Sequence, residues 1–475
     1  MPDKRSPPRG SAPQEPTSVT EQILKEVHEM YVLTDTGAPL SSSIYEPVLR
    51  PALLTPGKEG IMAICSKLGL KCIAPRRKIN VMIVGNHSAG KSSYINWYIG
   101  EPVQKAGIAI ETQGFTFCTS GKQRTTLKGE ATLQLFQHFI PEVEPFKPAI
   151  YNGLQTEIST SKNKCFNLIT FIDTPGLVDG SFHYPYPVED AIVSIAKHSD
   201  LIYIFFDPIG QALCDRTMKT IEMLNRDHAE KLRYFLSKAD TVPDEMDRQK
   251  VVVQITQNLS SRIRNAHAFE LPSIYIPDKT PNCTINNAVE KTCEEMESTI
   301  LQSVQNNLNN LERDCRRVAS TIDAVLADDK EKRKFNRTAC CYGNLIFLSA
   351  LQLPVLAIAI LTAYSRAEWF EQLGTAAPSA FRLINRTADI LLADEAGPDG
   401  TGTGLLSVHQ FLFYTLAVTT VLFLASRIFG KYQPYYSKRE LANLIQTKQY
   451  VMEHLLERKA SLYKLYFDQS VSELQ

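Results

Sequence analysis

The hydrophobic and polar positions of the first half of this chain alternate between two patterns. Short apolar runs, each the length of a strand, are separated by longer amphipathic segments, which is typical of an α/β fold with a mostly parallel sheet. The runs predict strands at residues 79–84, 167–173, 201–206, 232–236 and 273–276. Helices are predicted at residues 20–33 and from Lys91 onward.

Farther along the chain, apolar residues recur every three or four positions and predict two long helices. The first apolar seam consists of Val304, Leu308, Leu311, Cys315, Val318, Ile322 and Val325. The second helix, Lys438 to Phe467, has a stripe of Leu441, Leu444, Ile445, Val451, Met452, Leu455, Leu462 and Leu465. The first seam needs a packing partner, either inside the same protomer or in a second copy. The second helix can pair with it, or its basic residues can place it on an acidic membrane surface. Those residues are Lys448, Arg458 and Lys459.

Two stretches between these helices are apolar enough to cross a membrane. Residues 338–365 contain no charged side chain, and the second stretch is broken only by His409 and Gln410 near its start. A bilayer core of about 30 Å needs about 20 apolar residues in a helix. We therefore predict transmembrane segments at 342–365 and 405–426, since no amphipathic segments remain to bury them.

Basic residues flank the outer ends of both predicted spans. They are Lys330, Lys332, Arg333, Lys334 and Arg337 before the first span, and Arg427, Lys431, Lys438 and Arg439 after the second. The positive-inside rule places both outer sides in the cytosol and the connecting loop in the lumen. That loop contains the glycosylation sequon Asn385-Arg386-Thr387. The endoplasmic reticulum or another endomembrane is favoured, with the mitochondrial outer membrane as the alternative. Cys340 and Cys341, at the membrane edge, suit S-acylation or simply a helix start.

The first strand leads into a phosphate-binding loop, Gly85-x-x-x-x-Gly90-Lys91-Ser92. Glycines allow the backbone N–H groups to turn toward an anion at a helix N-terminus. Lys91 is predicted to reach the β- and γ-phosphates, and Ser92 to bind Mg²⁺. The predicted nucleotide-binding residues of this loop are Gly85, Asn86, His87, Ser88, Ala89, Gly90, Lys91, Ser92 and Ser93.

Two further motifs follow in the order that a P-loop nucleotidase needs. Asp173-Thr174-Pro175-Gly176 ends one strand, so that Asp173 can bind Mg²⁺ and Gly176 can donate its N–H to the γ-phosphate. Ser237-Lys238-Ala239-Asp240 ends another strand. There the Asp240 carboxylate can accept two N–H groups of guanine while the Lys238 stem covers the ring. Three motifs in order at strand ends predict a nucleoside triphosphate site.

These motifs resemble those of the dynamin superfamily of large GTPases, whose P-loop reads G-x-x-S-x-G-K-[ST]. Within it, "LIYIFFDPIGQALCDRTMKTIEML" and "LSKADTV" resemble the EHD (EH-domain-containing) ATPases, over roughly residues 20–330. No EH domain follows. The resemblance implies that Ser88 helps to position the attacking water and a charge-compensating cation. It also implies that Thr112, or alternatively Thr116, closes over Mg²⁺. The predicted catalytic set is Ser88, Lys91 and Thr112, and the predicted metal ligands are Ser92, Thr112 and Asp173.

Two departures from the usual motifs affect the expected chemistry. Leu177 follows the DTPG motif where Ras-type enzymes have a glutamine, so hydrolysis is expected to be slow and to depend on switch closure and assembly. Ser237 replaces the usual asparagine of the base-recognition motif, and the EHD branch uses ATP. GTP with Mg²⁺ is predicted because of Asp240, and ATP is the alternative.

Net charge and cysteine spacing limit the kinds of partner and metal site that the chain is expected to have. The 475 residues carry no net formal charge, so a nucleic-acid partner is not expected. The ten cysteines have no metal-binding spacing and are expected to be reduced. The predicted organisation is a disordered N-terminus (1–19), an N-terminal helical segment (20–70), a dynamin-type G domain (71–282), a helical stalk (283–339), the first span (342–365), a lumenal loop (366–404), the second span (405–426) and a cytosolic C-terminal helix (427–475).

The arrangement is similar to that of mitofusins and atlastins. It predicts a membrane-anchored dynamin-like GTPase whose heads form homodimers or higher homo-oligomers, and which remodels, tethers or fuses membranes. Two alternatives are an EHD-like membrane-shaping ATPase and a nucleotide-gated membrane scaffold with little hydrolysis. A channel or transporter role for the two apolar segments is a third alternative, which is disfavoured because the first has no charged residue and the second has only His409 near its edge.

Overall fold

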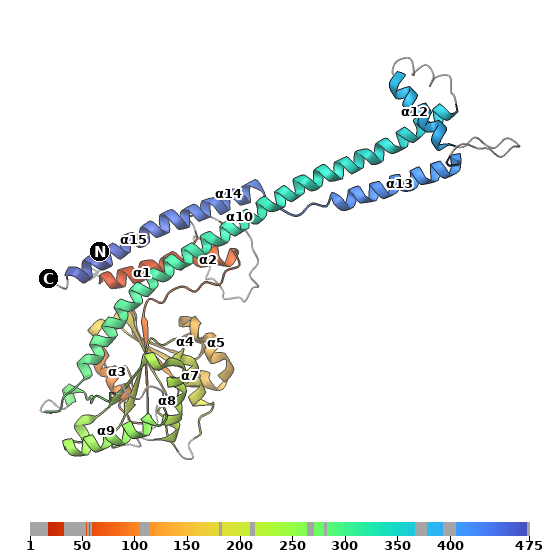
Figure 1. Cartoon of the computed structure of the whole chain (residues 1–475). Coiled ribbons are helices and arrows are strands. Elements are labelled where there is room, and N and C mark those ends of the chain that lie inside the picture. The colour runs from red at the N-terminus through yellow and green to blue at the C-terminus, as the bar shows by residue number, and fades with distance from the viewer. Residues whose placement is uncertain are drawn as a thin grey trace, which may run out of the picture.

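The computed structural model describes residues 18–32, 54, 57, 59–104, 114–179, 183–209, 214–263, 270–279, 283–365, 378–392 and 405–472. Figure 1 shows a head built around a sheet, a long helix that leaves it, and further helices lying along that helix. Nearly all of the N-terminal segment predicted to be disordered, and also Thr112, lie outside the described residues.

A mostly parallel sheet forms the head, as predicted. Its seven strands have the order β3-β4-β2-β5-β1-β6-β7. The strands are β1 (Ile79–Gly85), β2 (Thr116–Ser120), β3 (Thr125–Lys128), β4 (Gln155–Ser159), β5 (Ile169–Asp173), β6 (Leu201–Phe206) and β7 (Leu232–Leu236). Strand β2 runs antiparallel to β5, and β3 runs antiparallel to β4. Strands β1 and β6 are buried along their whole length, which explains why they read as continuous apolar runs.

Helices cover both faces of the sheet. One face packs against α2 (Ile61–Lys67), α3 (Lys91–Ile99) and the first turns of α10 (Val289–Tyr364). The other face packs against α4 (Glu130–Leu135), α5 (Ile140–Val143), α6 (Ala149–Asn152), α7 (Val188–Ala196), α8 (Asp215–His228) and α9 (Glu245–Ser260). The apolar core on the first face continues without a break into the helical region, so the head and the helices share one core.

The sheet differs from the predicted strands in two places. Residues 273–276 are not a strand, because only Ser273 forms a bridge, to Leu236 of β7. The strands β2, β3 and β4 were missed since they are short and polar, and β3 is largely exposed. Strand β5 starts at Ile169, two residues later than predicted, because Asn163–Leu168 forms a tight turn ahead of it.

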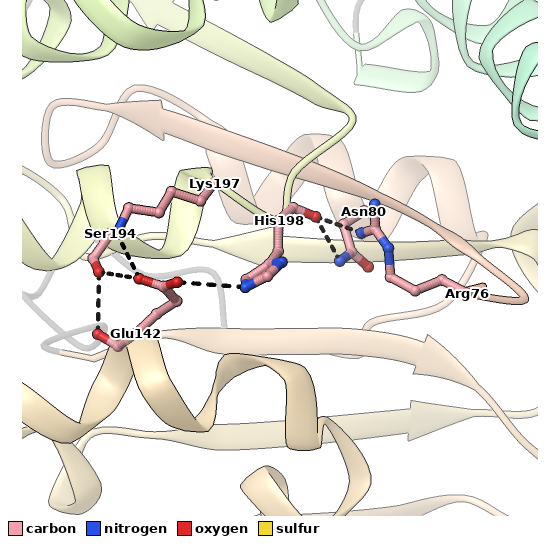
Figure 2. A network of polar contacts seen from close by, with 6 residues as sticks. All are labelled: Arg76, Asn80, Glu142, Ser194, Lys197 and His198. Carbon is pink, nitrogen blue, oxygen red and sulfur yellow. Dashed lines mark hydrogen bonds and ion pairs between the residues drawn. The ribbon is translucent and has the colours of Figure 1, made fainter. Parts of the chain in front are cut away.

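Polar contacts fix the linker that enters β1 from α2 (Figure 2). Arg76 of this linker donates to the His198 carbonyl and pairs with Asp200 at 2.8 Å. Asn80 of β1 also donates to the His198 carbonyl, at 2.9 Å. On the other side, Glu142 accepts hydrogen bonds from residues at the end of α7, namely Ser194 and Lys197, each at 2.8 Å. The network fixes the start of β1 against the segment that precedes β6 (Leu201–Phe206), at the end of these strands opposite the P-loop.

The predicted stalk and first span form one helix. Helix α10 has 76 residues and continues through Pro354. Its predicted seam is buried against α1 (Val19–Val32), α14 (Lys438–Gln449) and α15 (Leu456–Ser472) of the same chain, with Val325 only partly buried. The partner that the seam needs is therefore present within the protomer.

The C-terminal helix packs on this bundle through a narrower stripe than predicted. Leu444, Val451, Leu455 and Leu462 are buried, whereas Ile445, Met452 and Leu465 are exposed. A π-helical turn, Tyr450–Leu455, separates α14 from α15. The three basic residues of the stripe all pair with acidic residues of the bundle: Lys448 with Asp323, Arg458 with Glu26, and Lys459 with Glu312, each at 2.7 Å. These pairs argue against the alternative in which this helix lies on an acidic membrane.

The far half of α10 and α13 (Val408–Phe429) form an antiparallel hairpin. A Cβ added at Gly343 would lie 3.1 Å from the Cα of Gly430, so the two backbones approach closely. Phe347 and Phe423 meet farther along, with ring centroids 6.2 Å apart. Helix α13 extends three residues past the predicted end of the second span, and it starts at Val408 because Ser407 and Gln410 form a capping box.

Both helices of the hairpin can cross a membrane by length and composition, and their large side chains point outward. Only 17% of the most apolar window of α10, and 11% of that of α13, is buried. A helix of similar composition in a soluble core would be mostly buried. The predicted lumenal loop contains α12 (Pro378–Leu391), and the sequon residue Asn385 lies inside this helix with its amide oxygen buried.

Candidate nucleotide-binding site

The P-loop connects the C-terminal end of β1 to α3. Gly85 closes the strand, and Gly90 (φ 85°) and Ser88 (φ 63°) adopt left-handed backbone conformations that turn the loop. Lys91 is the first residue of the helix. The peptide N–H groups of a helix N-terminus carry partial positive charge, so this loop is built to hold phosphate.

Lys91 is buried inside the loop. Its ammonium donates to the carbonyl oxygens of Gly85, at 3.2 Å, and of Asn86, at 3.1 Å. Burial lowers the pKa of Lys91, and the nearby Asp173 carboxylate acts in the opposite direction. A buried ammonium that has only neutral carbonyl acceptors gains most from an anionic ligand. Phosphate oxygens would supply that ligand.

Ser92 and Asp173 lie together where Mg²⁺ would be expected. The Ser92 hydroxyl donates to Asp173 Oδ2 at 2.6 Å. Asp173 is fully buried, and among the described residues its Oδ1 has no hydrogen-bond partner. Burial raises the pKa of Asp173, while the charge of Lys91 lowers it. A buried carboxylate with an unpartnered oxygen beside a hydroxyl fits a hard cation that also binds phosphate oxygens. In the described residues no group of three or more His, Cys, Asp or Glu side chains forms another metal site.

The DTPG segment lies directly on the P-loop. Leu177 N donates to the Gly85 carbonyl at 3.2 Å, and His87 N donates to the Leu177 carbonyl at 3.0 Å. A Cβ at Gly176 would lie 2.8 Å from the Cα of His87, so only glycine fits there. The Leu177 side chain is buried. The position after DTPG therefore offers no polar group to a water molecule.

The other predicted loop residues take different positions. The Asn86 side chain contacts α8, where its Oδ1 accepts a hydrogen bond from the Thr217 hydroxyl. Ala89 is fully buried, His87 is half-buried and Ser88 is exposed. Of the two switch threonines, Thr116 is buried in β2, where Gln155 donates to its hydroxyl at 2.9 Å. Thr116 therefore belongs to the sheet in this structure, and Thr112 lies in a part of the chain that is not described.

A cavity of about 190 Å³ lies beside the P-loop, between it and the base-recognition motif. Its lining includes Gly90, Ser93, Lys238, Asp240, Tyr275 and Val289. Residues from four separate segments thus surround one space, at the place where a base joined to P-loop phosphates would lie. The backbone of Ile274 connects two of them, donating to Leu236 at 2.8 Å and accepting from Ala239 at 3.2 Å.

Lys238 is oriented by a residue that the sequence motifs did not identify. Lys238 has a left-handed backbone (φ 51°), and its stem passes 3.7 Å from a Cβ built on Gly90. Its ammonium pairs with the nearly buried Asp207 at 2.9 Å. Asp207 follows the apolar run of β6, so a carboxylate at that strand end was the available signal.

Ser237 connects the base-recognition loop to β6. Its hydroxyl donates to the Phe206 carbonyl at 3.1 Å, and its backbone N–H donates to the same oxygen at 2.8 Å. The serine that replaces the usual asparagine therefore still anchors this loop, through the adjacent strand.

The first turn of α10 is part of the same site. Asn287 Oδ1 accepts from the backbone N–H groups of Tyr275, at 3.2 Å, and Val289, at 3.1 Å. Its amide nitrogen donates to the Tyr275 carbonyl at 2.9 Å. One turn later in α10, the hydroxyl groups of Thr292 and of Tyr94 in α3 form a hydrogen bond of 2.6 Å. The 76-residue helix is thus joined to the base cavity and to the helix that follows the P-loop.

Residues 80–238, about a third of the chain, match the family model described as 50S ribosome-binding GTPase. No curated protein matches the chain significantly. One similar solved structure belongs to an oligomerised bacterial dynamin pair, described as a mechanism for the long-range sensing and tethering of membranes. It shares 12% identity, with 84% of this chain and 71% of that chain covered (TM-score 0.37). Another is a dimerization-deficient mutant of Toc33 from Arabidopsis thaliana, at 15% identity, with 48% and 82% covered (TM-score 0.26).

Proposed function

We propose that this protein is a membrane-anchored GTPase that remodels or tethers membranes through nucleotide-dependent pairing of its heads. One observation carries the proposal. The same helix, α10, lines the base cavity with its first residue, Val289, and enters the exposed apolar hairpin with its last turns. A change at the nucleotide therefore acts directly on the element that is anchored in lipid.

The chain's own residues suit phosphate binding and slow hydrolysis. The P-loop amides and Lys91 hold the triphosphate, and Asp240 with the Lys238 stem selects the base. Ser92 and Asp173 would hold Mg²⁺, which when bound neutralises negative charge on the phosphates. Ser88, exposed on the left-handed turn of the loop, orients the attacking water, and Thr112 completes the site on closure. Since Leu177 is buried and apolar, the scheme assigns the positioning of water to Ser88 and not to the residue after DTPG.

Rigid packing supports the transmission of force. The seam of α10 is filled by α1, α14 and α15, and ion pairs connect the helices at three levels. A bundle of this kind moves as one body. We propose that nucleotide closes the switch segments, that closed heads bind each other as homodimers or higher homo-oligomers, and that α10 passes the strain to the bilayer.

The choice of GTP over ATP is tested by competition. Labelled GTP bound to the purified full-length protein with Mg²⁺ is challenged with unlabelled GTP or ATP. We expect GTP to displace the label at much lower concentration, because only guanine offers two N–H groups to Asp240. Equal displacement by ATP would favour the ATPase alternative.

Membrane coupling is tested by reconstitution into liposomes with GTP, ATP or a non-hydrolysable GTP analogue. Hydrolysis, vesicle clustering and lipid mixing are followed together. We expect clustering with GTP, and its loss in Lys91→Ala, since charge-assisted hydrogen bonds of about 1.5–3 kcal/mol to the phosphates disappear. Lys250→Ala is the control, because Lys250 is exposed and pairs with Asp247 on its own helix, α9. Clustering that persists in Lys91→Ala would leave an anchored scaffold with no mechanochemical role for the nucleotide.

A further inference from the structure

Helix α12 has a part of its apolar surface that no described residue covers. Phe381, Ile384, Ala388 and Leu391, spaced by three and four residues, pack against the end of the hairpin. Leu383 and Ile390, seven residues apart on a neighbouring strip, are 66% and 51% exposed. The charged residues Arg382, Arg386 and Asp389 occupy the remaining side and are exposed. The helix therefore has three strips: one toward the hairpin, one apolar and open, and one charged.

The position of α12 along α10 fixes its depth relative to a membrane. Its apolar contacts on α10 fall between Ala357 and Tyr364, the last two turns of the charge-free stretch. That stretch, residues 338–365, is about 42 Å long at about 1.5 Å per residue. The hydrocarbon core is only about 30 Å thick, so the ends of the stretch lie in the interfacial layer. Figure 1 shows α12 beside the ends of α10 and α13 that are farthest from the head.

We propose that α12 is an interfacial helix of the distal leaflet, which places Leu383 and Ile390 among the lipid acyl chains and Arg386 and Asp389 at the headgroup level. This inference rests on the proposed membrane anchoring. An apolar strip beside a charged strip is the arrangement of helices that lie in the membrane plane. The occupant of the open strip is lipid and not protein, because α12 packs on the distal ends of both spans and its exposed Leu383 and Ile390 lie near the depth where those spans leave the hydrocarbon core.

Anchoring of α12 has a mechanical consequence for the hairpin. Two adjacent spans alone can tilt and shift in depth, whereas a helix that lies across their distal end resists both movements. It also adds volume to one leaflet only, which favours curvature toward the opposite side. Movements of the head would then act on a bilayer that α12 has already curved at the anchor.

Tryptophan emission in bilayers of brominated lipid tests the position of α12. Full-length protein carries Trp369→Phe, which leaves Trp97 of α3 in the head as an internal reference. Single tryptophans are introduced as Leu383→Trp, Ile390→Trp, Arg386→Trp or, within the span, Leu351→Trp. Each variant is reconstituted in phosphatidylcholine with or without bromine on the acyl chains. Helical content and GTP binding are measured to establish that each variant is folded.

We expect Leu383→Trp, Ile390→Trp and Leu351→Trp to lose emission in brominated lipid, and Arg386→Trp to keep it. Loss at Leu351→Trp without loss at Leu383→Trp and Ile390→Trp would overturn the proposal for α12 and leave the anchor standing. Equal loss at Arg386→Trp would also overturn it, since α12 would then be surrounded by hydrocarbon. Loss at none of the positions would refute the membrane anchoring itself.

Discussion

The two halves of α10 bury opposite kinds of side chain. In the half that lies along the bundle, large residues such as Leu308, Leu311 and Val318 are fully buried. In the half that forms the hairpin, most buried positions are small, among them Gly343, Ala350 and Ala357, and Ile360 is the large exception. Most of the large residues there face outward, and Leu345 is 68% exposed. One continuous helix therefore changes from burying its large apolar side chains to exposing most of them, as a membrane-spanning helix would.

The difference indicates which force would hold each half in place in the proposed membrane arrangement. In water, removal of large apolar side chains from solvent drives packing. In lipid, the surroundings are as apolar as leucine, so helices associate through close contact of small residues. Total hydrophobicity does not separate the two cases, whereas the size of the buried residues does.

A polar cluster marks the junction of the halves. Asp329 is buried and accepts from the backbone N–H of Tyr436 at 2.8 Å, and Arg333 donates to Asp329 at 2.6 Å. Asn336 exchanges two hydrogen bonds of 2.8 Å with the backbone of Gln433. These contacts hold the segment that leaves α13 against α10. They keep the bundle and the hairpin in one register.

The largest expected difference between the halves comes from the same leucine truncation in each. Leu311→Ala opens a cavity in the bundle and should reduce the free energy of unfolding by about 2–5 kcal/mol. Leu351→Ala, on the lipid-facing side, should change it by less than about 0.5 kcal/mol. Thermal unfolding in lipid nanodiscs measures both. Comparable losses in the two variants would mean that the hairpin is a buried core and not a membrane anchor.

A second test places a large side chain at a buried position of the hairpin, where the two helices are in close contact. Gly343→Val places side-chain atoms against Gly430, where even a Cβ would lie 3.1 Å from its Cα. The two helices would have to move apart, which should reduce the free energy of unfolding by about 1–3 kcal/mol. Ser349→Val adds the same branched side chain at an exposed position of α10 and is the matched control. The readout is thermal unfolding in nanodiscs. A Gly343→Val protein as stable as Ser349→Val would show that close backbone contact does not hold the hairpin together.

The sequence predicted correctly those elements whose residue pattern is compatible with only one structure. The apolar runs of β1, β6 and β7 predicted their ends to within a residue. Strands β1 and β6 are buried along their whole length, whereas β7 is only partly buried at Arg233 and Tyr234. The motifs likewise indicated a phosphate site, since glycines and a lysine at a strand end have few other uses. The structure places Lys91, Ser92 and Asp173 together.

The residue pattern did not predict those elements and contacts that depend on tertiary packing. Strands β2 to β4 are short and rich in polar residues, so pairing defines them and their own pattern does not: β2 pairs with β5, β4 with β2, and β3 with β4. The hydrogen bond that the Asn86 amide accepts from Thr217 of α8 joins two distant segments, so the P-loop pattern alone does not reveal it. The pairing of Asp207 with Lys238 joins residues on two strand ends, which no local spacing reveals.

A third prediction concerns the head end of α10. Asn287→Ala removes the hydrogen bonds that join the first turn of α10 to Tyr275, at a cost of about 1–2 kcal/mol in unfolding free energy. Both Tyr275 and Val289 line the base cavity, so GTP affinity should fall several-fold as well. Titration with fluorescent GTP is the measurement. Asn258→Ala is the control, since Asn258 is exposed on α9 and donates to a carbonyl of its own helix. Unchanged GTP affinity in Asn287→Ala would show that the first turn of α10 does not contribute to nucleotide binding.

A response to pH is expected from the head alone. Burial lowers the pKa of His138 to about 3, and its Nε2 has no hydrogen-bond partner among the described residues. The folded state thus keeps the ring neutral, while the unfolded state takes up a proton near the usual pKa of 6.5. Stability is therefore complete above pH 6.5 and falls as the pH drops toward 3, by about 1 kcal/mol per pH unit from this residue.

His138→Phe should remove much of this loss between pH 6.5 and 5. Part will remain, because burial also lowers the pKa of His198, against the opposing charge of Glu142. That carboxylate, whose own pKa Lys197 and Ser194 lower against the effect of burial, loses its charge only at more acidic pH. Residues 338–365 of α10 contain no His, Asp or Glu. Thermal unfolding of the full chain across this pH range should therefore follow the head, while bromolipid quenching of Leu351→Trp stays constant. A shift in that quenching with pH would show that the membrane half of α10 depends on charges that its sequence does not contain.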